Sequence, residues 1–136
     1  MDFHSEEIDI KLIPLEKTKE WVSLTIKKEQ KELGHLSFIF CTDEYLLTIN
    51  QEYLNHNTYT DIITFNYVED KLISGDIFIS IERVKENANQ FTTSFQNELN
   101  RVIIHGVLHL IGYNDKTDLE AQEIRAKEDF YLTLHP

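Results

Sequence analysis

Residues 94–112 read SFQNELNRVIIHGVLHLIG, and this stretch decides the fold. Its apolar residues recur at the spacing of a helix, and glycine, here Gly112, is the residue type at which helices commonly end. The runs VII and VL within the stretch have the composition of a buried core. We therefore expect a central buried helix that runs from Ser94 to about Ile111.

The segments around this helix predict the remaining elements. A T-x-x-E capping box at Thr117–Glu120 opens a last helix that ends near Leu132. On apolar spacing we expect strands at 8–12, 36–41, 61–67 and 76–81, and helices at 16–33, 43–53 and 81–91. Asp43 is the expected cap of the second helix, and Gly34 the expected end of the first. The last two strands are expected to form an antiparallel pair, with a polar loop at residues 69–71 and a turn at residues 74–75 between them.

Length and composition fit one globular unit. The chain has 136 residues, of which 41% are hydrophobic and 27% charged, and it contains no repeat or low-complexity tract. We expect an α+β fold in a single domain over residues 1–136, with a small mixed sheet of about four strands packed with helices. Cys41 is the only cysteine, which excludes an internal disulfide, and its apolar neighbours indicate a buried thiol.

Other features of the sequence bear on location and charge. No stretch approaches the ~18–20 apolar residues that a membrane span needs. The first residues carry no basic apolar leader, so the cytoplasm is the expected location. The formal net charge of −11 repels polyanions and excludes indiscriminate nucleic-acid binding. If the protein acts on nucleic acid, we expect a local basic groove or a partner that brings the substrate.

The central helix carries a candidate metal site. His105 and His109 are four residues apart, so their side chains stack on one helix face and can reach a single ion. The chain turns after Gly112, and Asp115 falls where a reversed chain brings its carboxylate to the same ion. Two histidines, one carboxylate and an open position are typical of a catalytic site, whereas a structural zinc site has four protein ligands. The alternative is that the H-x-x-x-H pair arises by chance.

The residue after the first histidine bears on the type of enzyme. In the H-E-x-x-H helix of zinc peptidases, a glutamate at this position is the general base. This chain has Gly106 there. The sequence therefore argues against peptidase activity.

Several motifs together resemble those of the YbeY family of bacterial rRNA maturation factors. The most specific is HGVLHLIGY at residues 105–113. Further landmarks follow the family's order along the chain: Asn50 with Tyr53, TDIITF at 60–65, GDI at 75–77, and Glu98 with Leu99. The resemblance implies a zinc-dependent single-strand endoribonuclease that acts in small-subunit (16S) rRNA 3′-end maturation and ribosome quality control. It also implies one Zn²⁺ per chain and, as partners, the small ribosomal subunit with a ribosomal protein or assembly GTPase.

Two positions depart from the family pattern. By the resemblance, His105 and His109 are the first two metal ligands, and Asp115 stands where the family usually has a third histidine. A carboxylate is a competent zinc ligand, although its charge makes the metal less electrophilic. The family usually has an arginine after the L-N-x-x-Y tyrosine, where this chain has Leu54. Arg101, one turn before His105, is a candidate substitute that contacts phosphate, or else a solvated helix charge.

The remaining candidates are weaker. Glu98 lies on the same helix face as His105 and is either a structural residue or a candidate acceptor for an imidazole N–H, while the general base stays unassigned. His56 is a candidate substrate contact, and Tyr59 and Tyr113 are either candidates for stacking on unpaired bases or loop residues that only pack within the protein. The sequence leaves two other functions open: a zinc peptidase-like hydrolase, and a non-catalytic ribosome-assembly factor with a structural metal.

Overall fold

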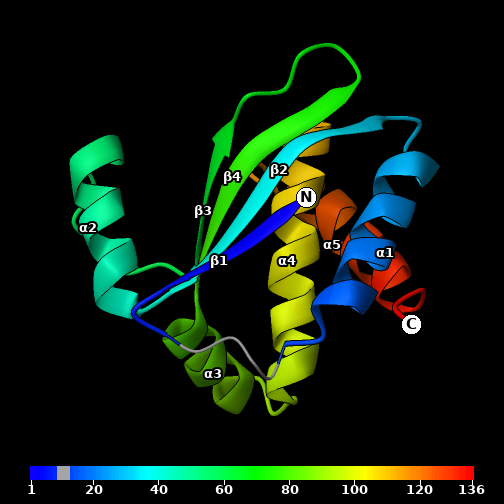
Figure 1. The fold of residues 1–136 in the computed structure, drawn as a ribbon. Helices are drawn as coiled ribbons and strands as arrows, with labels where there is room; N and C mark the ends of the chain where they lie inside the picture. Colours follow the sequence, from blue (N-terminus) through cyan, green and yellow to red (C-terminus); the bar gives the residue numbers. More distant parts are fainter. Residues whose placement is uncertain (9–12) are drawn as a thin grey trace.

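The computed structural model describes residues 1–8 and 13–136. Within this part of the chain a four-stranded sheet packs with five helices, so the expected α+β fold is confirmed (Figure 1). The strands are β1 (Asp2–Glu6), β2 (Glu32–Cys41), β3 (Ile62–Asn66) and β4 (Leu72–Ser80). The helices are α1 (Leu15–Lys28), α2 (Asp43–Leu54), α3 (Ile81–Gln90), α4 (Phe95–Ile111) and α5 (Asp118–Leu132). Of these described helices, none is long and apolar enough to cross a bilayer.

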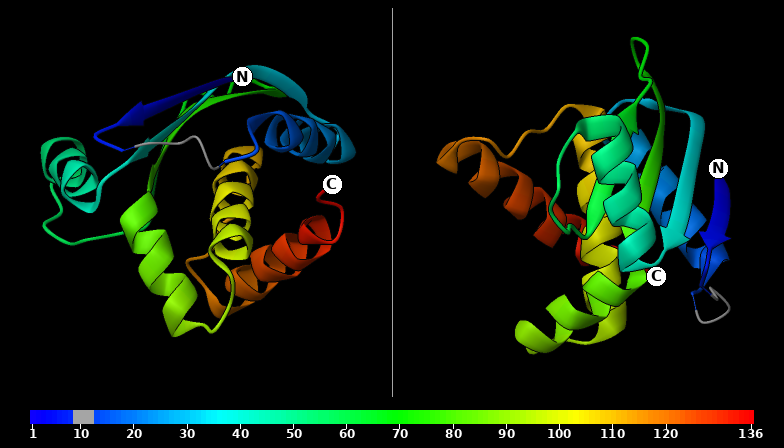
Figure 2. Two further views of the ribbon diagram at one scale, coloured as in Figure 1. Left: turned by 60° about the horizontal axis from the view of Figure 1, so that its bottom comes forward. Right: turned by 90° about the vertical axis from the view of Figure 1, so that its left-hand side faces the viewer.

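The sheet is mixed, with strand order β1-β2-β4-β3. β1, β2 and β4 are parallel to one another, and β3 is antiparallel to β4, which confirms the predicted hairpin. α4 runs between the sheet and α5, with α1 beside it on the same face (Figure 2). α2 packs against β3 and β4 around a separate small cluster of Cys41, Leu46 and Ile63. Cys41 is fully buried, as expected.

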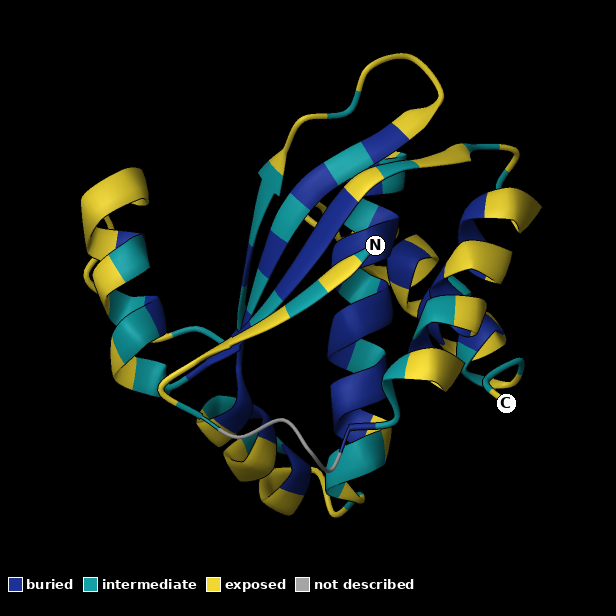
Figure 3. Cartoon of the chain, in the orientation of Figure 1, coloured by how far each residue is buried: buried dark blue, intermediate teal, exposed yellow. Residues whose placement is uncertain are grey.

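α4 is the central buried helix that its sequence predicts (Figure 3). Ser94 caps it by accepting a hydrogen bond from the Asn97 backbone N–H. Gly112 ends it with a φ of 127°, a conformation that side-chain-bearing residues rarely adopt. Midway, Gly106 allows the helix to lie close to the sheet, because a Cβ there would be 2.8 Å from Ile62 Cδ1. The histidine helix is thus held tightly against β3.

Two glycines that were predicted to break elements lie inside strands instead. The predicted helix at 16–33 ends earlier, at Lys28, and Gly34 belongs to β2. A Cβ on Gly34 would lie 2.2 Å from Ser74 Oγ, and one on Gly75 would lie 2.5 Å from the Phe65 carbonyl oxygen. Both glycines therefore permit close packing between neighbouring strands, and the prediction of a turn at residues 74–75 is wrong. The turn between β3 and β4 lies instead in the polar loop predicted at residues 69–71, where Asp70 has a φ of 55°.

The ends of other elements also differ from expectation. Most of the strand predicted at 8–12 lies outside the described residues. The sequence did not predict β1, which is mostly exposed and pairs with β2 at the edge of the sheet. The cap of α2 is Thr42 rather than Asp43, because the Thr42 side chain accepts from the Tyr45 N–H. The capping box of Thr117 and Glu120 at the start of α5 is confirmed.

Candidate metal centre

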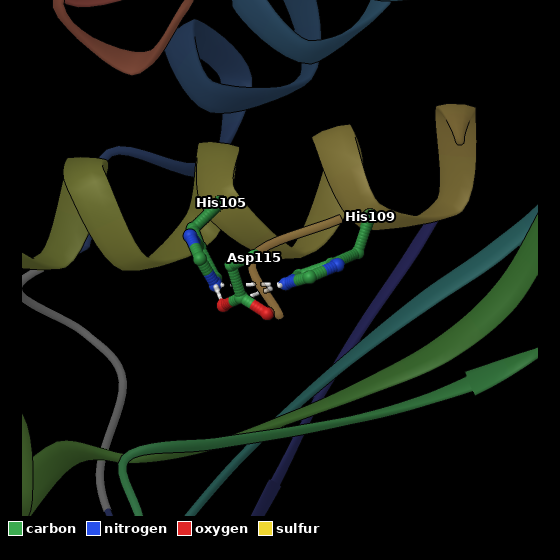
Figure 4. Close-up of side chains that lie close together, drawn as sticks. All are labelled: His105, His109 and Asp115. Carbon is green, nitrogen blue, oxygen red and sulfur yellow. Dashed lines mark hydrogen bonds and ion pairs between the residues drawn. The ribbon is translucent and has the colours of Figure 1, made fainter. Parts of the chain in front are cut away.

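His105 and His109 project from one face of α4 toward the loop that follows Gly112 (Figure 4). The turn at Gly112 reverses the chain, and Asp115 comes to lie opposite the two rings. The two Nε2 atoms are 3.0 Å apart. Asp115 Oδ2 is 3.5 Å from His105 Nε2 and 3.4 Å from His109 Nε2. Three donor atoms from the predicted residues therefore converge on one point.

The spacing of these donors fits a tetrahedral ion. Ligand atoms ~2.0–2.1 Å from a tetrahedral zinc lie about 3.3–3.4 Å from one another. The three observed separations bracket that value, and the donor set of two imidazoles and one carboxylate is one that zinc accepts. The two histidine side chains are 24% and 25% exposed, so a fourth position can open to solvent. The group could bind a divalent metal ion.

A carboxylate that sequence analysis missed contacts His105 at Nδ1, the ring nitrogen that does not face the other two donors. Glu128 on α5 is 3% exposed, and its Oε2 lies 2.6 Å from His105 Nδ1. An ionised carboxylate only accepts hydrogen bonds, so Nδ1 carries the proton and the Nε2 lone pair faces His109 and Asp115. Burial by itself lowers the pKa of His105, but the hydrogen bond and charge of Glu128, with the charge of Asp115, raise it overall.

This arrangement corrects the role expected for Glu98. Glu128, not Glu98, accepts the imidazole N–H. Arg101 lies beside it, and its terminal nitrogens donate to Glu128 at 3.0 Å and to Asp129 at 2.7 Å. The guanidinium that was a candidate phosphate contact is thus paired with two carboxylates. No sequence signal pointed to Glu128, because it lies 23 residues from His105 on a different helix.

A cleft of about 530 Å³ opens beside the three donors. His105 and Asp115 line it, together with Asp61, Glu98 and Arg125. Burial raises the pKa of both Asp61 and Glu98. Nearby Asp61 adds to the shift at Glu98, while Arg101 and Arg125 oppose it. Arg125, which sequence analysis also missed, lies 3.9 Å from Glu128 Oε1 and is the more exposed of the two arginines, with 64% of its side chain accessible.

The other predicted contacts lie elsewhere. His56 and Leu54 line a second hollow of about 320 Å³, and Ile62 borders both this hollow and the cleft. Tyr59 lines neither: its hydroxyl donates to Glu44, and the Arg83 guanidinium lies 5.3 Å from its ring.

The loop that carries Asp115 is anchored to Glu29, which directly follows α1. The Tyr113 hydroxyl donates to Glu29 Oε1 at 2.6 Å. Glu29 Oε2 accepts from Tyr131 and from Lys127 Nζ. Burial alone raises the pKa of Glu29, but these hydrogen bonds outweigh it and hold the pKa below its ordinary value. Tyr113 thus supports the metal loop, and its hydroxyl is engaged within the protein.

Comparison with known proteins places the chain in a family. The sequence model described as endoribonuclease YbeY matches residues 1–135. The chain belongs to the YbeY family. An endoribonuclease YbeY from Flavobacterium johnsoniae is 54% identical over 115 residues, which cover 85% of this chain and 83% of the relative. One from Bacteroides fragilis is 44% identical over 132 residues, covering 97% and 95%.

A solved structure agrees with the assignment. The solution structure of a Thermotoga maritima protein matches this fold with a TM-score of 0.72 and 31% sequence identity. The match covers 97% of this chain and 87% of that protein. The resemblance drawn from the histidine motif is therefore confirmed over residues 1–135.

Proposed function

We propose that the protein is a zinc-dependent endoribonuclease that cuts single-stranded RNA in the cytoplasm during 16S rRNA 3′-end maturation and ribosome quality control. The observation that carries the proposal is the convergence of His105 Nε2, His109 Nε2 and Asp115 Oδ2 at tetrahedral spacing. Membership of the YbeY family supports the choice of RNA as substrate.

In this proposal His105, His109 and Asp115 hold one ion. When bound, such an ion acts as a Lewis acid and lowers the pKa of a coordinated water. Glu128 fixes the tautomer of His105 and the orientation of its ring. Asp115 brings a negative charge that a third histidine would not, which reduces the net positive charge offered to a phosphodiester.

The cleft gives RNA a route to these residues. It shares His105 and Asp115 with the donor cluster, so a strand that enters it passes directly beside the metal ligands. Arg125 is the exposed cation on its wall and is suited to meet a phosphate. Arg101, held between Glu128 and Asp129, positions Glu128 in this scheme rather than binding the substrate.

The first test measures metal and cleavage together. Wild-type protein purified without added metal or chelator is expected to contain about one zinc per chain by elemental analysis. His109→Ala and Asp115→Ala are expected to lose the metal and the cleavage of single-stranded 16S rRNA fragments. His35→Ala, an exposed histidine on β2, is the matched control and should keep both. Wild-type protein that lacks metal and does not cut would overturn the proposal.

A non-catalytic assembly factor is the second candidate, favoured by the −11 net charge and by Leu54 in place of the family's arginine. In that case a ribosomal protein or an assembly GTPase supplies the positive surface. Leu54→Arg adds a cation beside the second hollow. Increased RNA cleavage by this variant, abolished by adding His109→Ala, would exclude the assembly-only function. A peptidase is disfavoured, because Gly106 faces Ile62 and Ile77 of the sheet and provides no base.

A further inference from the structure

The cleft beside the metal centre contains a carboxyl group without a partner. Glu98 on α4 is 6% exposed and lines this cleft. Among residues 1–8 and 13–136, no side chain forms a hydrogen bond or ion pair with the Glu98 carboxyl. Among the described residues, the Glu98 oxygens are not fully enclosed unsatisfied atoms, so they are accessible from the cleft. These oxygens are therefore candidates to accept hydrogen bonds from a ligand.

The walls of the cleft suit a flat, apolar-faced ligand. Ile62 comes from β3, Val102 from α4, and Ala121 and Ile124 from α5. Phe91, just after α3, adds an exposed aromatic ring to the lining. Aliphatic and aromatic walls favour the faces of a nucleobase, whose polar atoms all lie on its edge.

The polar groups of the cleft can form hydrogen bonds with the edge of such a base. Glu98 and Asp61 accept hydrogen bonds when ionised, so they favour a base that presents N–H donors. Asn87 holds Asp61 in place, with Nδ2 3.4 Å from Asp61 Oδ2. Guanine offers two adjacent donors, N1–H and the 2-amino group, which match the two oxygens of one carboxylate as a guanidinium does. Uracil offers one N–H, and this donor lies between two carbonyl oxygens. A carboxylate repels those oxygens, because both groups are hydrogen-bond acceptors.

The position of the cleft ties this recognition to cleavage. His105 and Asp115 line the same cleft as Glu98, so a base inside it belongs to a nucleotide next to the bond at the metal. Burial raises the pKa of Glu98, the charges of nearby Arg101 and Arg125 oppose this rise, and the same two charges disfavour a second metal ion there.

We propose that this cleft is a base-binding subsite in which Glu98 accepts hydrogen bonds from guanine flanking the scissile phosphate. The proposal rests on the proposed function, because it assigns a sequence preference to that nuclease. It makes Glu98 a specificity-determining residue.

The binding test needs no cleavage. Affinities of the purified protein for 5′-GMP, 5′-IMP and 5′-UMP are measured by isothermal titration calorimetry. IMP lacks only the 2-amino group, so the phosphate and ribose contacts cancel in the comparison. We expect GMP to bind roughly 10-fold tighter than IMP, the size expected for one hydrogen bond to a charged group, and tighter still than UMP. Equal affinities for the three nucleotides would overturn the proposal.

Glu98→Gln tests the residue itself. The amide keeps the size of the side chain but replaces one acceptor with a donor, so the preference for GMP over IMP should disappear. Glu123→Gln, an exposed change on α5, is the control and should leave it unchanged. Because Glu98→Gln also removes a buried unpaired charge, we expect a higher melting temperature, which shows that the variant is folded. A Glu98→Gln protein that still prefers GMP would contradict the assignment.

A cleavage test then separates the two proposals. A single guanosine is moved along an oligouridine RNA, and inosine replaces it in a second series. Cleavage is expected next to guanosine and to fall roughly 10-fold next to inosine. Preferential GMP binding without any cleavage would contradict the proposed nuclease activity and support the guanine subsite. Cleavage at equal rates in both series would contradict the guanine subsite and support the proposed nuclease activity.

Discussion

The Glu128 carboxylate contacts two groups of different kinds, His105 Nδ1 and Arg101 Nη1. Arg101 offsets the cost of burying this charge, and Glu128 in turn directs the Nε2 lone pair of His105 toward the other donors. The affinity of the site for a metal ion is therefore set partly by Glu128, which is not one of the three donor residues.

Glu128→Gln tests this dependence. The amide oxygen can still accept from His105, but it carries no charge to make the imidazole more basic. We expect zinc affinity to fall 10- to 100-fold, as is typical when such a partner is lost. Competition with a chromophoric chelator measures the affinity. Glu123→Gln on the same helix is the control, and unchanged affinity in Glu128→Gln would contradict the role given to Glu128.

Glu29 gives a pH-dependent prediction. Its pKa in the folded protein is held below the ordinary value of 4.5, so ionised Glu29 stabilises the fold. This contribution is fully present above about pH 4.5 and is lost as the pH falls through the lowered pKa. We expect Glu29→Gln to lower the free energy of unfolding by about 1–3 kcal/mol at pH 7 and by less at pH 4.

Urea denaturation at the two pH values measures the difference. Glu32→Gln, an exposed change at the start of β2, is the control and should have little effect at either pH. A Glu29→Gln deficit that stays constant or grows toward pH 4 would show that Glu29 is not held in its charged form.

At the scale of single residues, the sequence predicted the three candidate metal donors but not the residues that hold them in place. His105, His109 and Asp115 lie within eleven residues, so helix geometry and one glycine turn bring them together. Glu128 lies on α5 and Glu29 directly follows α1, and only tertiary packing determines their contacts with His105 and Tyr113. Glu98 was one candidate acceptor for the imidazole N–H, and Glu128 occupies that position instead, because helix spacing predicts which residues share a face but not what packs on it.

At the scale of the elements, the contact between α4 and β3 positions the metal ligands. A Cβ on Gly106 would lie 2.8 Å from Ile62 Cδ1 and 3.2 Å from Ile77 Cγ2. We expect Gly106→Ala to lower the free energy of unfolding by about 1–2 kcal/mol, because overpacking outweighs the better helix propensity of alanine.

The double variant Gly106→Ala/Ile62→Val is the matched test, because it removes the methyl group that the new Cβ meets. Urea denaturation of both single variants and the double variant gives their coupling. The double variant should be more stable than the sum of the single effects predicts. Additive changes in the free energy of unfolding would show that the new Cβ on Gly106 does not clash with Ile62.

The elements also show where sequence patterns stop being informative. α4 and α5 have clear periodicity and caps, so both were predicted to within a residue or two. The errors at α1, β2 and β4 come from Gly34 and Gly75, which permit close strand contacts but look like breaks in the sequence. β1 has little apolar character, since it is an edge strand with four of its five residues exposed.

At the scale of the whole molecule, a net charge of −11 must be reconciled with a polyanionic substrate. The cleft is lined by four carboxylates, Asp61, Glu98, Asp115 and Glu128, and by two arginines. Arg101 is paired closely with two of the protein's acids, whereas Arg125 is mostly exposed and makes only a 3.9 Å ion pair with Glu128, which leaves Arg125 as the cleft cation more available for phosphate. The protein should therefore make few phosphate contacts and bind free RNA weakly.

Salt dependence tests this conclusion. For single strands, the slope of log K against log salt concentration is about −0.7 per phosphate neutralised. We expect a shallow slope for the wild type, made shallower by about 0.7 in Arg125→Gln. The measurement uses fluorescence anisotropy with a 2′-O-methyl oligonucleotide, which resists cleavage. Lys17→Gln on α1 removes the same charge away from the cleft and should leave the slope unchanged. If Arg125→Gln and Lys17→Gln change the slope equally, the whole field of the protein governs RNA binding and the cleft does not.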